Sequence, residues 1–260
     1  MPPTPTPTPP FHITPAIERL IDLAMEEDIG GGDITTAALV DTHTRGTAEM
    51  IAKEPLVMAG GSVAARVFEK IDATCTATAH IAEGDHIGAG NCLITVTGPL
   101  YALLTGERTA LNFVQHLSGI ATHVRSFADI AAGSRVRLVD TRKTIPGWRP
   151  LAKYAVRVGG CANHRTGLFD GVLIKDNHIT ACGGIYKAVA KARKTLPHLS
   201  KIEVEVSSPA ELDEALAAGV DVIMLDNMDI TTIKSTQAID RDGIGIVGLK
   251  YLFHAQVHGG

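Results

Sequence analysis

Short apolar runs alternate with helical segments through the second half of the chain, and this alternation constrains its fold most. The runs lie at residues 135–140, 171–176, 201–206 and 221–226, with a weaker one at 244–249. The helical segments lie at about 151–158, 180–196 and 208–218. Because a strand followed by a helix returns the chain in the same direction, the pattern predicts parallel βαβ units.

Charged residues lie at the carboxyl ends of these predicted strands. The set consists of Asp140, Arg142, Lys143, Lys175, Asp176, Glu205 and Asp226. In α/β barrels this edge forms the active site. A complete eightfold barrel takes roughly 250 residues, whereas only 126 lie from Arg135 to the last residue, Gly260. The sequence therefore predicts an incomplete α/β barrel with its chemistry at the strand ends.

The first part of the sequence has a different pattern, which predicts a small α+β domain over 15–105. Residues 15–27 have helical apolar spacing, and the glycines at 30–32 end that helix. Residues 46–58 and 74–98 read as short strands between glycines.

Two further segments complete the predicted organisation. Residues 105–132 predict one long helix, or two helices broken at Gly119, with Thr105 as N-cap. We place the second domain at 106–260. The Pro/Thr-rich residues 1–14 predict a disordered polyproline tail outside the fold.

Positive charge is concentrated between Arg108 and Lys175. This window holds eleven Lys or Arg and three acids, a net charge of +8 in a protein whose net charge is −4. Such a field concentrates small anionic substrates. A pI near 6.2 and 4% aromatic residues argue against a nucleic-acid-binding protein.

The remaining composition predicts a cytoplasmic protein without a membrane partner. The four cysteines show no metal-ligand spacing, which favours free thiols in a reducing compartment. No apolar run is long enough to span a bilayer. The first residues have neither the basic nor the apolar region of a signal peptide.

Long ordered motifs occupy the same charged segments. They are GERTALNFVQHLSGIAT at 106–122, DTRKTIPGWRPLAKYAVRVGG at 140–160, NHRTGLFDGVLIKDNHI at 163–179, EVEV at 203–206 and MLDNM at 224–228. With EEDIGGGDITTAAL at 26–39, they resemble quinolinate phosphoribosyltransferase, also called nicotinate-nucleotide pyrophosphorylase (carboxylating). The resemblance runs from about residue 15 to 228.

The resemblance implies a fold, a reaction and an assembly. The fold is an open α/β sandwich domain followed by an incomplete α/β barrel. The reaction transfers ribose 5-phosphate from phosphoribosyl pyrophosphate to the nitrogen of quinolinate, releases pyrophosphate and carbon dioxide, and makes nicotinate mononucleotide for NAD biosynthesis. The assembly is a homodimer, or a higher oligomer, with shared active sites.

The resemblance also assigns eight candidate site residues. The quinolinate-binding positions are Arg142, His164 and Arg165, together with Arg108 reaching across from a neighbouring subunit. Guanidinium groups suit this role because they bind carboxylates in bidentate geometry.

The remaining four residues carry the catalytic roles that the resemblance implies. Lys143 and Lys175 lie near the carboxylates and the phosphoribosyl group, and compact ammonium charges suit phosphate. Glu205 and Asp226 hold the ribose hydroxyls and the Mg²⁺-pyrophosphate. Mg²⁺ prefers oxygen ligands and retains waters, so we expect it to be bound mainly through pyrophosphate.

Three alternatives stay open. A lysine at a barrel strand end also serves as the nucleophile of Schiff-base lyases, which would use Lys175. A phosphoribosyltransferase-like paralogue linked to molybdenum transport has related motifs. Residues 229–260 show no residue-by-residue match to the family, which leaves the 5′-phosphate ligands unassigned. A folded but inactive anion-binding relative is therefore the other serious hypothesis.

Overall fold

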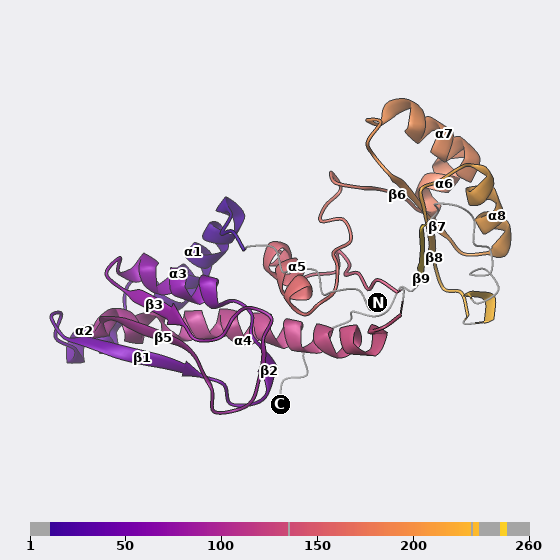
Figure 1. Ribbon diagram of the computed structural model, residues 1–260. Helices are drawn as coiled ribbons and strands as arrows, with labels where there is room; N and C mark the ends of the chain where they lie inside the picture. Colours follow the sequence, from indigo (N-terminus) through magenta and orange to yellow (C-terminus); the bar gives the residue numbers. More distant parts are fainter. Residues whose placement is uncertain (1–10, 135, 230, 234–244, 249–260) are drawn as a thin grey trace. The chain divides into compact units, whose positions relative to one another are not determined.

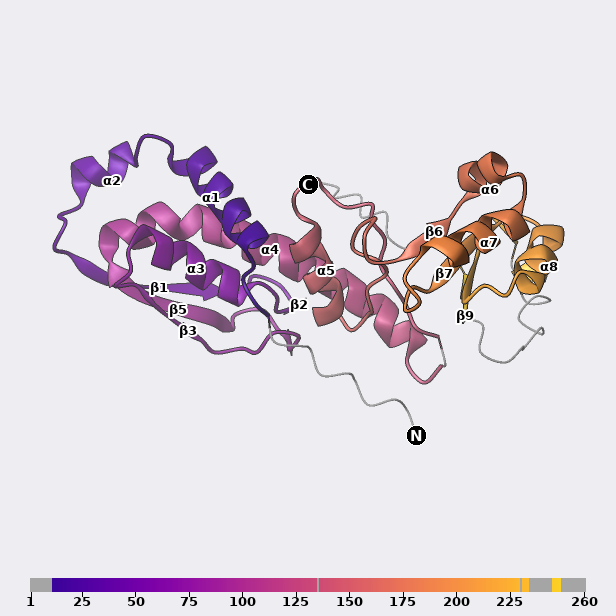
Figure 2. The ribbon, with the colours of Figure 1, turned by 90° about the horizontal axis from the view of Figure 1, so that it is seen from above.

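The computed structural model describes residues 11–134, 136–229, 231–233 and 245–248. The protein forms two compact units, Met1–His164 and Arg165–Gly260. Each unit has its own apolar core. Figure 1 shows the elements of both, and Figure 2 shows them from above.

The first unit begins with two helices that are capped by side chains. Helix α1 spans Pro15–Ile29, and its N-cap Thr14 accepts a hydrogen bond from Ile17 N–H. This confirms the predicted helix at 15–27. Helix α2, Ile34–Leu39, begins after Asp33, which accepts from Thr36 N–H.

Packed residues precede α1. The rings of Phe11 and Tyr154 lie 4.2 Å apart, and Phe11 and Ile13 pack against the first core. The predicted tail therefore ends before Phe11. The prediction for residues 1–10 lies outside the described residues.

The strands of the first unit form two small antiparallel sheets. Strands β1 (Arg45–Ile51), β5 (Cys92–Pro99) and β3 (Thr76–Ala79) form the sheet β1-β5-β3, and β2 (Leu56–Val57) pairs with β4 (His86–Ile87). Helix α3, Gly61–Ile71, packs against α4. Mixed helices and antiparallel strands confirm the α+β character of this region.

Helix α4, Leu100–Ala131, is one unbroken helix of 32 residues. The alternative of a break at Gly119 is wrong, because this exposed glycine lies inside the continuous helix, and a Cβ added there would meet no neighbouring side chain or segment within 4 Å. Thr105 as N-cap is also wrong. The helix begins five residues earlier, after Pro99, since Ala102 and Leu103 already lie in the core.

The predicted strand at 135–140 does not form a regular strand among residues 136–140. Only an isolated parallel bridge joins Val139 to Ala162. Its backbone hydrogen bonds run from Asp140 N to Ala162 O and from Ala162 N to Leu138 O. A strand needs a partner along its length, and here the partner is a single residue. Helix α5, Arg149–Val158, lies between the two segments and packs into the first core.

The second unit contains a four-stranded parallel sheet. Its strands are β6 (Val172–Ile174), β7 (Ile202–Val206), β8 (Val222–Leu225) and β9 (Gly245–Gly248), in the order β6-β7-β8-β9. Pairing is parallel throughout. The predicted strands at 171–176, 201–206, 221–226 and 244–249 are confirmed.

Helices also connect strands β6, β7 and β8. They are α6 (Asp176–Cys182), α7 (Ile185–Thr195) and α8 (Pro209–Ala217). The single helix predicted at 180–196 is two helices, because Gly183 and Gly184 adopt positive φ angles of 77° and 127° that end α6. Among the described residues, no helix combines the length and the apolar character that a membrane span requires.

Candidate active site

The eight predicted site residues divide equally between the two units. Arg108, Arg142, Lys143 and His164 belong to the first unit, and Arg165, Lys175, Glu205 and Asp226 belong to the second.

Strand alternation places three of the second unit's residues on one face of its sheet. Side chains alternate between the two faces of a strand. Ile174, Val204 and Ile223 pack in the core with the helices. Since Ile174 pairs with Val204 and Glu205 pairs with Met224, residues 175, 205 and 226 project from the opposite face, at the carboxyl ends of β6, β7 and β8.

An ion pair joins two of these three side chains. Lys175 Nζ lies 2.6 Å from Glu205 Oε2, and the side chain of Glu205 is only 12% exposed. Asp226 is buried and its N–H donates to Val206 O at 2.8 Å. The next residue, Asn227, has a φ of 55°, so the backbone turns sharply after Asp226. The sheet edge therefore presents one ammonium and two carboxylates.

Arg165 is half-buried at the start of the second unit. Its Nη1 donates to Gly171 O at 3.1 Å, which orients the guanidinium with one of its five N–H groups. The His178 side chain accepts from Lys175 N–H at 3.0 Å and caps α6.

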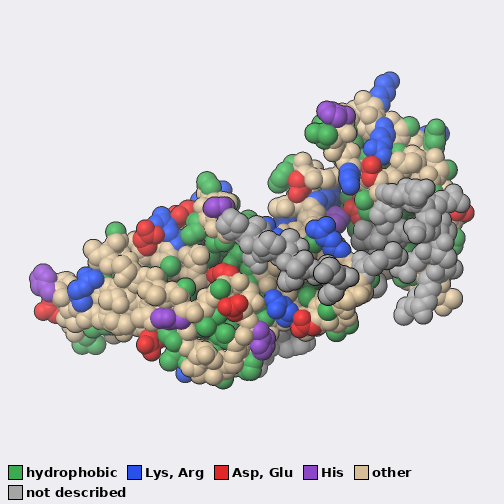
Figure 3. Space-filling model, viewed as in Figure 1, with side chains coloured by type: hydrophobic (Ala, Val, Ile, Leu, Met, Phe, Trp, Pro, Cys, Tyr) green, Lys and Arg blue, Asp and Glu red, His purple; other side chains and the backbone are tan. Residues whose placement is uncertain are grey.

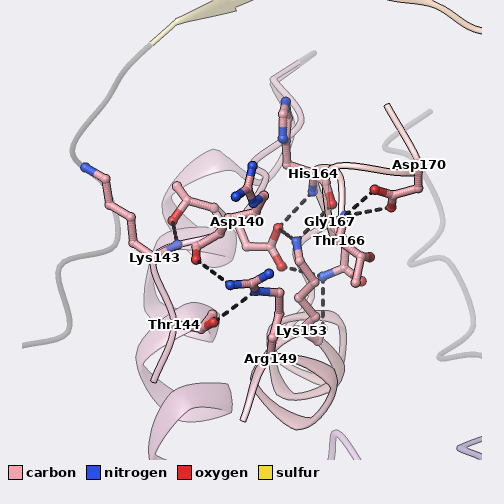
Figure 4. Close-up of polar contacts among 12 residues, drawn as sticks. Asp140, Lys143, Thr144, Arg149, Lys153, His164, Thr166, Gly167 and Asp170 are labelled. Atoms are coloured by element: carbon pink, nitrogen blue, oxygen red, sulfur yellow. Dashed lines mark hydrogen bonds and ion pairs between the residues drawn. The ribbon is translucent and has the colours of Figure 1, made fainter. Parts of the chain in front are cut away.

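In the first unit, a buried ion pair organises the polar segments around α5. Lys153 Nζ lies 2.5 Å from Asp140 Oδ1, and both side chains are 6% exposed. The same carboxylate accepts from His164 N–H at 2.8 Å and from Asn163 Nδ2 at 2.7 Å. Figure 4 shows these contacts and the His164 imidazole pointing away from the Asp140 carboxylate. Asp140 thus brings segment 140–143 and segment 163–164 together.

The loop between Arg142 and α5 is held at two further points. Arg149 donates through Nε to Thr144 Oγ1 at 3.1 Å and through Nη2 to Arg142 O at 3.3 Å (Figure 4). The ring of Trp148 stacks on Phe113 and meets His116 edge-on, at centroid distances of 5.1 and 4.8 Å. Burial lowers the pKa of His116, which favours a neutral imidazole in this apolar contact.

Arg142 itself has an unusual environment for a charged side chain. Its Nε is buried and has no hydrogen-bond partner within the part of the protein that the structure describes. A buried donor without a partner is costly, so this position is suited to an anionic ligand. Lys143, the next residue, is exposed and its side chain extends away from the cluster (Figure 4).

Arg108 is exposed on α4 between two anchored threonines. Thr105 Oγ1 donates to Asp33 and Thr109 Oγ1 donates to Asp28, each at 3.2 Å. These bonds hold segment 28–33 beside Arg108. No ion pair between Arg108 and its neighbour Glu107 is found among the described residues.

Several polar residues of these clusters received no role from the sequence. Lys153 is one of them, and the structure shows that it is buried. Asp140 and Asn163 had no assigned contact. Glu203 lies on the same sheet face as Glu205 and is buried, and the alternation I-E-V-E-V at 202–206 was the signal for both glutamates.

Glu205 and Asp226 provide carboxylate oxygens on neighbouring strands, which suits Mg²⁺ with retained waters. No group of three or more His, Cys, Asp or Glu side chains that could hold a metal occurs in the described residues. The donor set therefore fits an ion that draws further oxygen ligands from a substrate.

Both halves of the sequence match known family models. Residues 33–118 match the quinolinate phosphoribosyl transferase N-terminal domain, and residues 120–247 match the C-terminal domain of the same family. The second match extends beyond Met228, where we expected the resemblance to end, and covers β9 up to residue 247.

Curated relatives and solved structures agree with these matches. The protein is 46% identical over 226 residues to a probable nicotinate-nucleotide pyrophosphorylase (carboxylating) of Synechocystis, covering 87% of this sequence and 76% of that protein. The corresponding Bacillus subtilis protein is 43% identical over 218 residues, covering 84% and 75%. NadC from Streptococcus pyogenes is structurally similar, with a TM-score of 0.88 and 40% identity, covering 94% of this protein and 87% of that one.

Proposed function

Because this chain belongs to the quinolinate phosphoribosyltransferase family, we propose that it transfers the phosphoribosyl group from phosphoribosyl pyrophosphate to quinolinate. The products are nicotinate mononucleotide, carbon dioxide and pyrophosphate, which places the enzyme, a pentosyltransferase, in NAD biosynthesis. The observation that carries this conclusion is the ordered match of both family domains, supported by relatives that are more than 40% identical over most of the sequence.

Quinolinate is bound by cationic side chains in this proposal. Its two adjacent carboxylates suit Arg142, His164 and Arg165, with Arg108 supplied by a second copy in a homodimer. The buried Nε of Arg142 has no hydrogen-bond partner among the described residues, and this supports its role, since an anion would satisfy that donor. The exposure of Arg108 supports a role toward another subunit.

Phosphoribosyl pyrophosphate is bound by the other four residues in this proposal. Lys143 and Lys175 bind its phosphate groups, and Glu205 and Asp226 hold the ribose hydroxyls. For the three residues of the second unit, the common sheet face and the Lys175–Glu205 ion pair support this assignment. Mg²⁺, when bound through pyrophosphate with Glu205 and Asp226, neutralises negative charge on the leaving group.

Positioning and electrostatics supply the chemistry. Positive charge develops at ribose C1′ as the bond to pyrophosphate breaks, and the carboxylates of Glu205 and Asp226 offset it. The quinolinate nitrogen forms the new bond to C1′ and becomes cationic. Breaking the bond to the adjacent carboxylate then releases carbon dioxide and leaves its electron pair on the ring carbon, where the neighbouring positive charge stabilises it. Uptake of a proton from water forms the C–H bond of the product. Desolvation in a closed site strengthens each of these interactions.

The structure weighs against the Schiff-base lyase. That chemistry needs the Lys175 amine as a nucleophile facing the substrate carbonyl, whereas Lys175 Nζ lies 2.6 Å from Glu205 Oε2, in an ion pair with this carboxylate. We place the enzyme in the cytoplasm, and the four free cysteines are compatible with a reducing compartment.

A product assay tests the proposal. Purified protein is incubated with quinolinate, phosphoribosyl pyrophosphate and Mg²⁺, and we expect nicotinate mononucleotide and one carbon dioxide per turnover. Omission of phosphoribosyl pyrophosphate is the control. Calorimetric binding of quinolinate without product would establish the inactive anion-binding relative. Borohydride trapping of a substrate adduct on Lys175 would establish the lyase.

A further inference from the structure

We propose that Asp140 and Lys153 are positioning residues that set the affinity for quinolinate by clamping the backbone of His164. This inference deepens the proposed function, on which it rests. The contacts that carry it join Asp140, Lys153, Asn163 and His164, which all belong to the first unit.

The clamp holds both backbone polar groups of His164. Asp140 Oδ1 accepts from His164 N–H at 2.8 Å, and Lys153 Nζ donates to His164 O at 2.9 Å. The ion pair between the two side chains closes this arrangement (Figure 4). With the N–H and the carbonyl group both fixed, the direction of the His164 side chain from the backbone is fixed as well.

Asn163 locks the clamp from the preceding residue. Its Nδ2 donates to Asp140 Oδ2 at 2.7 Å and to Lys153 O at 2.9 Å. The carboxylate thus accepts three hydrogen bonds, and each partner lies on segment 163–164 or on α5. Such a saturated network tolerates little displacement of its members.

Burial and sequence order connect the clamp to the ligand. Both charged side chains are 6% exposed, so neither is presented to a solvent-borne substrate. Asp140 is two residues before Arg142 and the clamped His164 is directly before Arg165. One buried pair therefore fixes the backbone next to three of the residues that we assign to quinolinate.

A fold-stabilising role alone would not require this geometry. Taking two charges into the interior is costly, and apolar replacements of buried ion pairs are often neutral or stabilising. The pair is explained if it is retained for the placement of His164, because ligand-binding groups must be held within about 0.5 Å of their productive position.

The test uses the double variant Asp140→Asn/Lys153→Met, which removes the pair without leaving a buried charge unpaired. Its matched control is Glu18→Gln/Lys70→Met, which removes the same charges from an ion pair on α1 and α3 of the same unit. Calorimetry measures quinolinate and phosphoribosyl pyrophosphate binding, steady-state kinetics measures KM and kcat, and thermal unfolding measures stability.

We expect the double variant to bind quinolinate roughly tenfold to hundredfold more weakly, as expected for misplaced binding groups. Its KM for quinolinate rises in parallel, while kcat and the affinity for phosphoribosyl pyrophosphate change by less than about threefold, the range of a neutral substitution. The control variant should bind quinolinate and phosphoribosyl pyrophosphate as the wild type does, even if its thermal stability is lower.

Asn163→Ala tests the clamp if the double variant does not fold. It leaves the Asp140–Lys153 ion pair in place and removes the two hydrogen bonds of the Asn163 side chain. It should weaken the binding of quinolinate and leave the binding of phosphoribosyl pyrophosphate unchanged. Unchanged quinolinate affinity in a folded variant, or equal losses for both ligands, would overturn the inference. A wild-type protein that binds no quinolinate would instead overturn the proposed function, and the clamp's role with it.

Discussion

Arg142 combines two properties that an ordinary surface arginine lacks. Its Nε is buried, and it finds no hydrogen-bond partner within the described residues. Its carbonyl oxygen accepts from both Thr144 N–H and Arg149 Nη2. The backbone is therefore fixed while part of the charged group is left for a ligand, which is the state expected of an anion-binding residue before its substrate arrives.

Arg142→Lys should weaken quinolinate binding by about 1.5–3 kcal/mol, the contribution of a charged hydrogen bond. The reason is that lysine lacks the planar fork that binds a carboxylate in bidentate geometry. Calorimetric titration measures the change. Arg137→Lys, an exposed position in the same unit, is the matched control, and equal affinities in the two variants would remove Arg142 from the site.

At the scale of single elements, α4 is the helix against which the first unit is built. Ala110, Phe113, Leu117 and Ala121 lie in its core, and α5 packs against it. Gly159, the C-cap of α5, lies close against α4. A Cβ there would lie 2.6 Å from Val124 Cβ and 2.7 Å from Ala121 O. The two helices meet closely because this residue has no side chain.

Two glycine substitutions should therefore have opposite effects on stability. Gly159→Ala should destabilise the protein by about 1–3 kcal/mol, since the added methyl group overpacks a helix contact. Gly119→Ala should stabilise it by about 0.5–1 kcal/mol, because the helical position is open and alanine favours the helix. Chemical denaturation measures both values, and a stabilising Gly159→Ala would show that the helices can separate without loss.

The sheet of the second unit shows why its charged residues gather at one edge. Parallel strands have all their carboxyl ends on the same side. Each of β6, β7 and β8 is apolar on its helix-facing side and is followed by or ends near a charged residue. The order of strands and helices is therefore enough to place Lys175, Glu205 and Asp226 at the same edge of the sheet. The ion pair between Lys175 and Glu205 depends in addition on the register in which β6 and β7 pair.

At the scale of the whole molecule, the proposed assembly is a homodimer with shared active sites. Figure 3 shows Lys and Arg side chains on the surface of the described residues among many apolar and acidic ones. If Arg108 acts in the site of a second copy, no subunit has a complete site by itself. Variants defective in different halves of the site should then complement each other.

Arg108→Ala and Lys175→Ala should each be inactive alone and regain activity when mixed after reversible dissociation. Random reassociation makes half of the dimers mixed, and each mixed dimer has one site with both residues intact. We expect about one quarter of wild-type activity, as two-fold symmetry requires. The product assay measures it. Absence of recovery in a mixture shown to exchange subunits would place Arg108 in its own subunit's site or outside it.

The sequence by itself determined the strands of the second unit and the identity of the charges at their ends, whereas the one helix predicted at 180–196 is the two helices α6 and α7. Those features depend on local apolar periodicity and on glycines, which are visible along the sequence. The first residue of a helix was harder to predict from the sequence. Helix α4 begins at Leu100 because its first turns pack in the core, and Thr105 is therefore not its N-cap. The strand predicted at 135–140 failed for a related reason: its apolar residues lack a partner strand along most of their length.

Only the tertiary structure decided which polar residues work together. Lys153 had no visible partner in the sequence, since Asp140 lies 13 residues away and the carbonyl of His164 lies 11 residues away on the other side. A buried charge is stable only where distant segments bring a counter-charge and hydrogen bonds to it. That condition is a property of packing in three dimensions, so no local pattern could have distinguished this lysine from a solvated one.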